Sequence, residues 1–212
     1  MALYEYDFYL FRERSRGSIV SELTASGLLR PVGDGAGYLF GKIGTEFRET
    51  LNDQASDGPL CTVSFFLESH DVNNMLRHEP DQFIEGIWDL AKRIDIAYAF
   101  IGLSSDAAYV QVGKFTSAQV FGQVNQLVET GTVAYVHPLM YFAERVGSGR
   151  VCQAAQRAPK YTVEHKDGVG CLLVLMNRLA GGRVSIEDPG IIYPELINYF
   201  TEQTRTGASS PP

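Results

Sequence analysis

The fold is decided by residues 60–103, LCTVSFFLESHDVNNMLRHEPDQFIEGIWDLAKRIDIAYAFIGL. Leu60–Leu67 is apolar at six of its eight positions, which predicts a central β-strand, and Ile96–Leu103 predicts a second apolar strand. Between them we expect a loop and then a helix that has Asp81 as its N-cap. The apolar residues of this helix recur at the spacing of one helical face and are Phe83, Ile84, Ile87, Trp88, Ala91 and Ile94.

The N-terminus predicts a strand over residues 2–11. Every second side chain in it is apolar or aromatic, as on the buried face of a half-buried strand. The residues of this face are Tyr4, Tyr6, Phe8 and Leu10. Because the alternation accounts for them, we interpret the aromatic residues mainly as core and only secondarily as a contact surface.

The segment that links this strand to Leu60 predicts short elements. Ser18 is placed to cap a helix that Gly27 ends. Tyr38–Ile43 predicts a strand and Glu46–Leu51 a helical turn, while residues 52–59 are polar and contain glycine, as in a loop.

The C-terminal third predicts a helix followed by a hairpin. The helix is expected over Tyr135–Gln156, and the hairpin strands over Tyr161–His165 and Cys171–Met176. Asp167-Gly168 is a signal for a two-residue turn between these strands. A last helix is expected over Pro194–Gln203, with its proline in the first turn.

These elements predict an α+β fold with a single mixed or antiparallel sheet and helices packed on one face. A further helix is expected over Ser117–Glu129. We expect one domain over residues 1–205 and a disordered tail over residues 206–212, which are small and polar.

Composition narrows the function classes. The net charge of −7 argues against nonspecific binding to nucleic acid or anionic membranes, which requires clustered Lys and Arg. The first residues, MALYEYDFYLF, lack a basic region and carry two acids, so we expect no signal peptide and a cytoplasmic location. The three cysteines, Cys61, Cys152 and Cys171, are widely spaced, which favours reduced thiols over a disulfide framework or a zinc site.

One cluster of reactive residue types stands out, Glu68-Ser69-His70-Asp71 at the end of the strongest strand. Adjacent residues cannot form a Ser-His-Asp triad, because that mechanism needs side chains that converge from separate elements. The spacing of His70 and His78 matches no compact metal motif. We therefore predict no catalytic residue, no metal and no cofactor, and we interpret His137 as a boundary residue and His165 as solvent-facing.

A resemblance adds a function class. Residues 137–147 (HPLMYFAERVG), 158–168 (APKYTVEHKDG) and 172–175 (LLVL) resemble the C-terminal half of bacterial immunity proteins of the Imm52 and DUF3396 groups. The resemblance spans about residues 60–200. It implies a small cytoplasmic α+β protein that blocks a toxin delivered by a competing cell, and it assigns no functional residue.

The first function hypothesis is therefore a non-enzymatic, immunity-like protein that neutralises a toxin by direct binding. Its acidic balance would complement a basic protein partner and speed the encounter. The predicted partner-binding residues are Glu68, Asp71, Asp81, Glu85 and Asp89.

Two other hypotheses remain open on the sequence. One is an enzyme whose site combines the strand end Glu68–Asp71 with His78 or His137. The other is a phage or virus accessory or structural protein that self-assembles. The sequence carries no signal for the oligomeric state.

Overall fold

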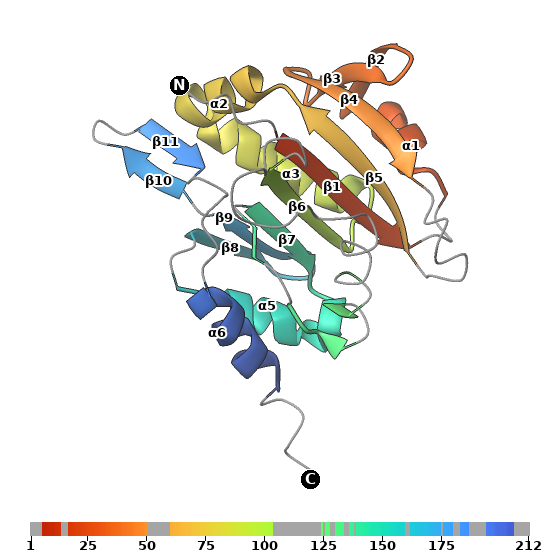
Figure 1. The fold of residues 1–212 in the computed structure, drawn as a ribbon. Coiled ribbons are helices and arrows are strands. Elements are labelled where there is room, and N and C mark those ends of the chain that lie inside the picture. Colours follow the sequence, from red (N-terminus) through yellow and green to blue (C-terminus); the bar gives the residue numbers. More distant parts are fainter. Residues whose placement is uncertain are drawn as a thin grey trace.

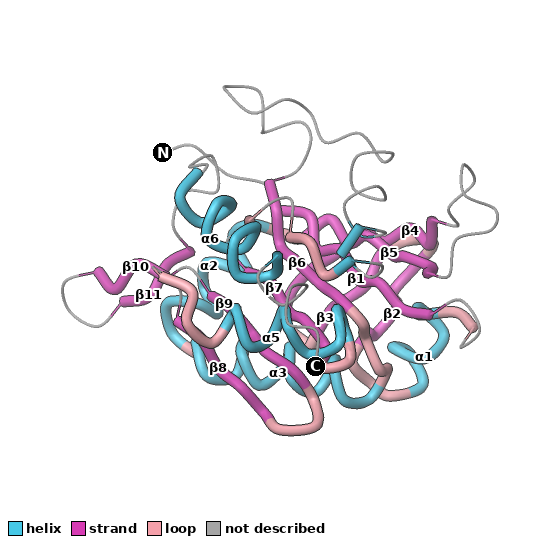
Figure 2. The backbone as a smooth tube through the Cα atoms, turned by 90° about the horizontal axis from the view of Figure 1, so that it is seen from below, coloured by secondary structure: helices cyan, strands magenta, loops and turns pink. Residues whose placement is uncertain are grey.

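The computed structural model describes residues 6–13, 17–50, 60–103, 124, 126–127, 130–133, 136–137, 139–159, 162–174, 176–179, 183–186 and 194–205. Its main feature is one nine-stranded sheet in which all neighbours are antiparallel (Figure 1). In spatial order the strands are β2 (Leu29–Gly33), β3 (Ala36–Leu39), β4 (Ile43–Thr50), β5 (Leu60–Leu67), β1 (Tyr6–Glu13), β6 (Tyr98–Leu103), β7 (Leu139–Ala143), β9 (Gly170–Val174) and β8 (Thr162–Lys166). Figure 2 shows the sheet extending from β8 at one edge to β2 at the other.

Strand β1 lies in the middle of the sheet, between the two strands of the 60–103 segment. Phe8 pairs with Phe65 of β5 on one side and with Ile101 of β6 on the other. Tyr6, Phe8 and Leu10 are buried, which confirms the face predicted from alternation. Residues 6–13 therefore belong to the nine-stranded sheet.

Two helices connect β5 to β6 across one face of the sheet. Helix α2 (Ser69–His78) replaces the loop expected after β5, and helix α3 (Pro80–Arg93) confirms the predicted helix. Asp81 is not the N-cap, because Pro80 occupies the first helical position and Glu79 precedes it. The indole of Trp88 meets Tyr141 of β7 edge-on at a centroid distance of 5.9 Å, which places α3 over the Tyr141 face.

The segment after β1 contributes helix α1 (Ile19–Ala25), whose N-cap is Ser18 as predicted. Arg12 is fully buried beside this helix, where it pairs with Glu22 and donates to the carbonyl oxygen of Gly17 at 2.7 Å. Because a buried guanidinium needs such partners, Arg12 ties α1 to the sheet.

Two predictions between β2 and β5 are wrong. The stretch Tyr38–Ile43 is interrupted by a turn at Phe40, and Glu46–Leu51 contains a strand instead of a helical turn, since β4 runs to Thr50. The buried side chains of Ile43 and Thr45 alternate with less buried neighbours, as on a strand with one core face. Residues 52–59 lie outside the described part of the chain.

The helix predicted over Tyr135–Gln156 is also wrong. All five residues of β7 are buried, and the segment then turns through a 3-10 helix, Val146–Gly149, into helix α5 (Arg150–Ala155). A short run that is apolar throughout has no period that separates a buried strand from a helix. Gly147 and Gly149, both with positive φ, confine the helix to α5.

The predicted hairpin is confirmed as β8 and β9, with a different turn. Its loop has three residues, Asp167, Gly168 and Val169, because Lys166 pairs with Gly170. Gly168 takes a φ of 73°, the left-handed conformation that three-residue hairpin loops place on glycine.

The last elements are a small hairpin and a helix. Strands β10 (Met176–Leu179) and β11 (Arg183–Ile186) form a separate two-stranded sheet, and β11 lies against α2. Helix α6 (Pro194–Arg205) confirms the predicted terminal helix and buries Leu196 and Phe200. Helical backbone occurs at Val124, Gln126 and Leu127, within the predicted 117–129 helix, and at Thr130 just beyond it. The remainder of the predicted helix and the 206–212 tail lie outside the described residues.

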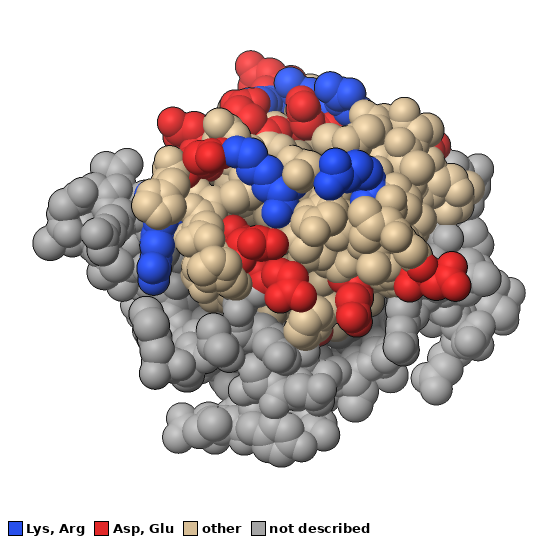
Figure 3. Space-filling view, turned by 90° about the horizontal axis from the view of Figure 1, so that it is seen from above, with Lys and Arg blue, Asp and Glu red and all other residues tan. Residues whose placement is uncertain are grey.

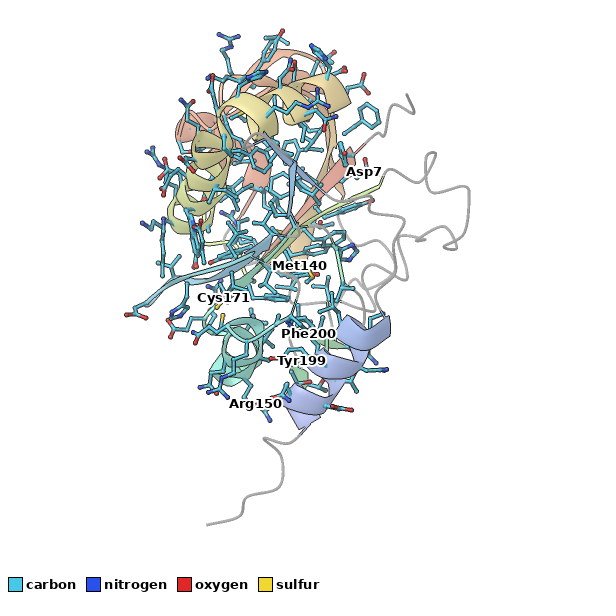
Figure 4. The ribbon with its side chains drawn as sticks, turned by 90° about the vertical axis from the view of Figure 1, so that its left-hand side faces the viewer. Asp7, Met140, Arg150, Cys171, Tyr199 and Phe200 are labelled. Carbon is cyan, nitrogen blue, oxygen red and sulfur yellow. The ribbon has the colours of Figure 1, made fainter. Side chains whose placement is uncertain are left out.

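Helices occupy both faces of the sheet. Cys171 points to α5, where its thiol donates to the carbonyl oxygen of Cys152 at 3.4 Å. Its neighbour Leu172 pairs with Tyr141 and so points to the face that α3 covers. Helix α5 therefore lies on the opposite face. Helix α6 packs on α5, and Tyr199 donates to Ala154 at 2.8 Å (Figure 4). The α+β class with one main sheet is confirmed, but the helices are not confined to one face.

Candidate partner-binding surface

Helix α3 carries three of the predicted partner-binding carboxylates on its solvent side. Asp81, Glu85 and Asp89 are all exposed and follow one another at four-residue intervals, so they form a stripe along the helix. The opposite face of α3 is embedded in the core through Phe83, Ile87 and Trp88, among others. The helix is thus held firmly while its acidic stripe faces solvent.

Two ion pairs hold the stripe in position. Glu85 lies 3.3 Å from the ammonium of Lys166 on β8, and Asp89 lies 3.5 Å from Arg93 one turn further along α3. Lys166 also sits 4.7 Å from the centre of the Trp88 ring, whose N–H donates to Glu164 at 2.8 Å. Exposed pairs of this kind add little stability, so their main effect is on side-chain position.

Glu68 and Asp71, the other two predicted contacts, fasten β4 to the start of α2. The backbone N–H of Glu68 donates to Gly44 O at 2.9 Å, and the Gly44 N–H donates to the Asp71 carboxylate at 2.9 Å. The Cγ atom of Glu68 lies 2.9 Å from where a Cβ on Gly44 would stand. Asp71 is therefore a structural residue of this junction, whereas the exposed Glu68 side chain is open to a partner.

Replacing Asp71 by alanine is expected to lower the free energy of unfolding by about 1–3 kcal/mol, because the Gly44 N–H loses a charged acceptor. Urea denaturation measures this. Asp81→Ala is the matched control, since Asp81 is exposed, and it should change stability by less than about 0.5 kcal/mol. Equal effects of the two substitutions would contradict the structural role of Asp71.

A second junction joins the β3–β4 turn to α3, and nothing in the local sequence pattern predicted it. Lys42 pairs with Glu79 and lies 3.1 Å from the side-chain oxygen of Gln82. Phe40 takes a φ of 54° and places its ring against Gly86, where a Cβ would come within 3.0 Å of it. Phe40 is a bulky residue with a positive φ, which is uncommon, but this backbone conformation cannot be recognised from the sequence.

The residues of the enzyme hypothesis do not form one site. Asp71 is bonded to Gly44, and the exposed His70 lies 2.9 Å from Asn74 on its own helix. His137 stacks on Phe100 of β6, three strands away from β4, where Asp71 bonds to Gly44. Among the described residues no group of three His, Cys, Asp or Glu is placed to hold a metal ion.

His137 is buried rather than at a boundary. Its ring stacks on Phe100 at a centroid distance of 3.9 Å, and burial lowers its pKa to about 3. It is therefore a neutral core residue near pH 7. His165 is exposed as predicted and lies 3.3 Å from Asp167.

The three cysteines are free thiols buried in the core, as predicted for Cys61 and Cys171 at the starts of apolar strands. Cys152 of α5 and Cys171 of β9 share a hydrogen bond, which together with burial raises the pKa of Cys152. Both thiols are buried and pack in the core.

Two further features of the molecule are the mixture of charges on its surface and the lengths of its helices. On the face seen from above, acidic and basic side chains are interspersed among uncharged ones (Figure 3). In the described part of the chain, every helix is too short or too polar to cross a bilayer.

Comparison with known proteins gives distant matches among solved structures. No family model and no curated protein matches the chain. Among solved structures, a Pseudomonas aeruginosa T6SS protein, PA0821, aligns with 12% identity and a TM-score of 0.48 over 95% of this chain and 74% of its own.

Proposed function

We propose that this chain is a non-enzymatic protein-binding module, an immunity-like inhibitor that neutralises a basic toxin by binding it. The proposal rests on the acidic stripe of α3 and on the resemblance of residues 137–175 to immunity proteins. The partner contacts Asp81, Glu85 and Asp89, and Glu68 adds a fourth carboxylate at the start of α2.

The observation that carries the proposal is the contrast between the two faces of α3. One face is fixed in the core and tied to β7 and β8 through Trp88, while the other presents carboxylates at a regular spacing. A preorganised charged surface loses little entropy on binding and steers an oppositely charged partner. Asp71 belongs to the fold and is not among the contacts.

The test begins with capture of the partner from the native host, with the full chain as bait, followed by purification of the protein that is bound. The double reversal Asp81→Lys/Glu85→Lys should slow association with that protein at least about ten-fold at low salt, because steering is lost. The difference should shrink as salt rises. Stopped-flow or surface plasmon resonance measures the rate.

The control Asp167→Lys/Glu202→Lys changes the net charge equally, at exposed positions outside α3. It should alter the association rate less than about two-fold, because neither carboxylate belongs to the α3 stripe. The absence of any toxin-like partner, or equal slowing by both double variants, would contradict the proposal.

A further inference from the structure

The hairpin of β2 and β3 exposes apolar side chains that the core does not use. Val32 and Tyr38 keep 59% and 36% of their surface accessible, and they are the exposed large hydrophobic residues of the described part of the chain. Leu29 and Leu39 alone anchor the two strands in the core. Exposed apolar residues that gather at one place on a protein mark a contact site more often than scattered ones do.

Carboxylates surround Tyr38 on its face of the sheet. Tyr38 pairs with Gly44 across β3 and β4, so Glu46, two residues beyond Gly44, is its diagonal neighbour on that face. Glu68 lies over Gly44, which has no side chain of its own. Both glutamates are exposed.

The aromatic ring is already held by a cation of this chain. The guanidinium of Arg30, the cross-strand partner of Tyr38, lies 5.0 Å from the ring centre. This stacking limits the freedom of both side chains before any partner arrives, which lowers the entropy cost of binding. With one cation against two carboxylates, the patch formed by Arg30, Tyr38, Glu46 and Glu68 remains acidic.

Recognition at this edge is by side chains rather than by strand addition. Pro31 has no backbone N–H, and the register shifts between Pro31 and Gly33, so β2 offers a poor template for another strand. The hairpin is also rigidly placed, because Phe40 and Lys42 at its far end are fixed to α3. Tyrosine and arginine are the residue types that most often dominate binding energy.

We propose that this patch, with Val32 beside it, is the second contact of the basic partner. It takes a segment in which a Lys or Arg meets Glu46 and Glu68 while an adjacent apolar residue covers Tyr38 and Val32. The inference rests on the proposed function. By strand register Tyr38 and Glu46 lie on the sheet face opposite to α3, so the partner would contact α3 and, around the β2–β3 edge, this second face.

The first test uses the purified partner. Tyr38→Ala should raise Kd by about 30-fold or more, mainly through faster dissociation, as for a central anchor. Val169→Ser, in the β8–β9 loop, is the control for removal of a partly exposed apolar group and should change Kd less than about three-fold. Urea denaturation of both variants verifies that they are folded.

The results separate the two proposals. If α3 charge reversal slows association and Tyr38→Ala leaves dissociation unchanged, the inference is wrong and the proposed function stands.

A second test needs no partner. A short peptide of alternating arginine and valine, titrated into the 15N-labelled full chain, should shift the amide signals of residues 30–46 at millimolar concentration. The Glu46→Gln/Glu68→Gln variant should weaken those shifts at least about three-fold, as expected for the loss of two charged contacts. No shift in this range, or shifts that the variant leaves unchanged, would overturn the inference even if a partner had been captured.

Discussion

Gly170→Ala is expected to lower the free energy of unfolding by roughly 4 kcal/mol or more, enough to unfold a typical domain of marginal stability. A Cβ at this position would stand 2.1 Å from the carbonyl oxygen of Phe142 and 3.0 Å from Cα of Ala143. Both obstacles are backbone, and the pairing of Ala143 with Gly170 fixes them in the sheet. The steric overlap of the new Cβ and the strain of an alanine at a φ of 156° both lower the free energy of unfolding.

Urea denaturation, or the yield of soluble protein where the variant does not fold, measures this effect. Two glycines serve as controls. Gly33→Ala meets nothing within 4 Å and should cost less than about 1 kcal/mol, while Gly168→Ala has open space but a φ of 73° and should cost about 1–2 kcal/mol. A Gly170→Ala protein as stable as the Gly33→Ala protein would show that β7 and β9 are not paired as described.

Acid is expected to destabilise the fold through His137, by roughly 4–5 kcal/mol in all as the pH falls from about 6.5 to about 3. Burial lowers the pKa of the folded His137 to about 3, whereas its value in the unfolded chain is near 6.5. Below pH 6.5 the unfolded state therefore binds a proton that the folded state does not. The stabilisation is complete above pH 6.5 and is lost as the pH falls through this window.

The comparison with His137→Phe isolates this contribution. Phenylalanine keeps a ring against Phe100 but does not titrate, so the variant should lose less stability between pH 6.5 and pH 5 than the parent, by roughly 2 kcal/mol. Urea denaturation at several pH values gives both curves, and the carboxylates common to both proteins cancel in the difference. Parallel curves would mean that His137 is accessible to protons in the folded state.

Sequence periodicity was a reliable guide where it was long. The apolar repeat of the helix that contains Phe83 and Trp88 runs over nearly four turns, and Leu60–Leu67 is apolar at six of its eight positions, as in a central strand. The prediction was wrong for the short segment that forms β7, which was expected to be helical. All five of its residues are buried, so no polar positions distinguish the period of a strand from that of a helix. Helix α2 was missed because it is mostly polar, with Val72, Met75 and Leu76 as its buried residues.

The candidate surface was visible in the sequence only in part. The spacing of Asp81, Glu85 and Asp89 follows directly from the α3 pattern. The different role of Asp71 does not, because it depends on a contact with Gly44, 27 residues away along the chain. The patch at Tyr38 was also hidden, since it needs the register of β3 against β4, and that segment was predicted to contain a helical turn.

The exposed carboxylates and the buried reactive residue types occupy different parts of the fold. The buried side chains of His137 and Cys152 pack in the core, where His137 stacks on Phe100 and the Cys152 thiol donates to the carbonyl oxygen of Phe142. The exposed carboxylates sit on elements that the core holds rigidly, at α3 and at the start of α2. We therefore expect a partner to bind through these carboxylates.

Carboxyl-group footprinting of the complex tests that claim most directly. The full chain, free and bound to the protein captured from its host, is labelled with a carbodiimide and an amine, and the modification of each acid is read by mass spectrometry. The account predicts that labelling of Asp81, Glu85 and Glu68 falls several-fold in the complex while Asp167, which is 99% exposed on the β8–β9 loop, keeps its reactivity. Unchanged labelling of the three acids, with protection elsewhere, would contradict it.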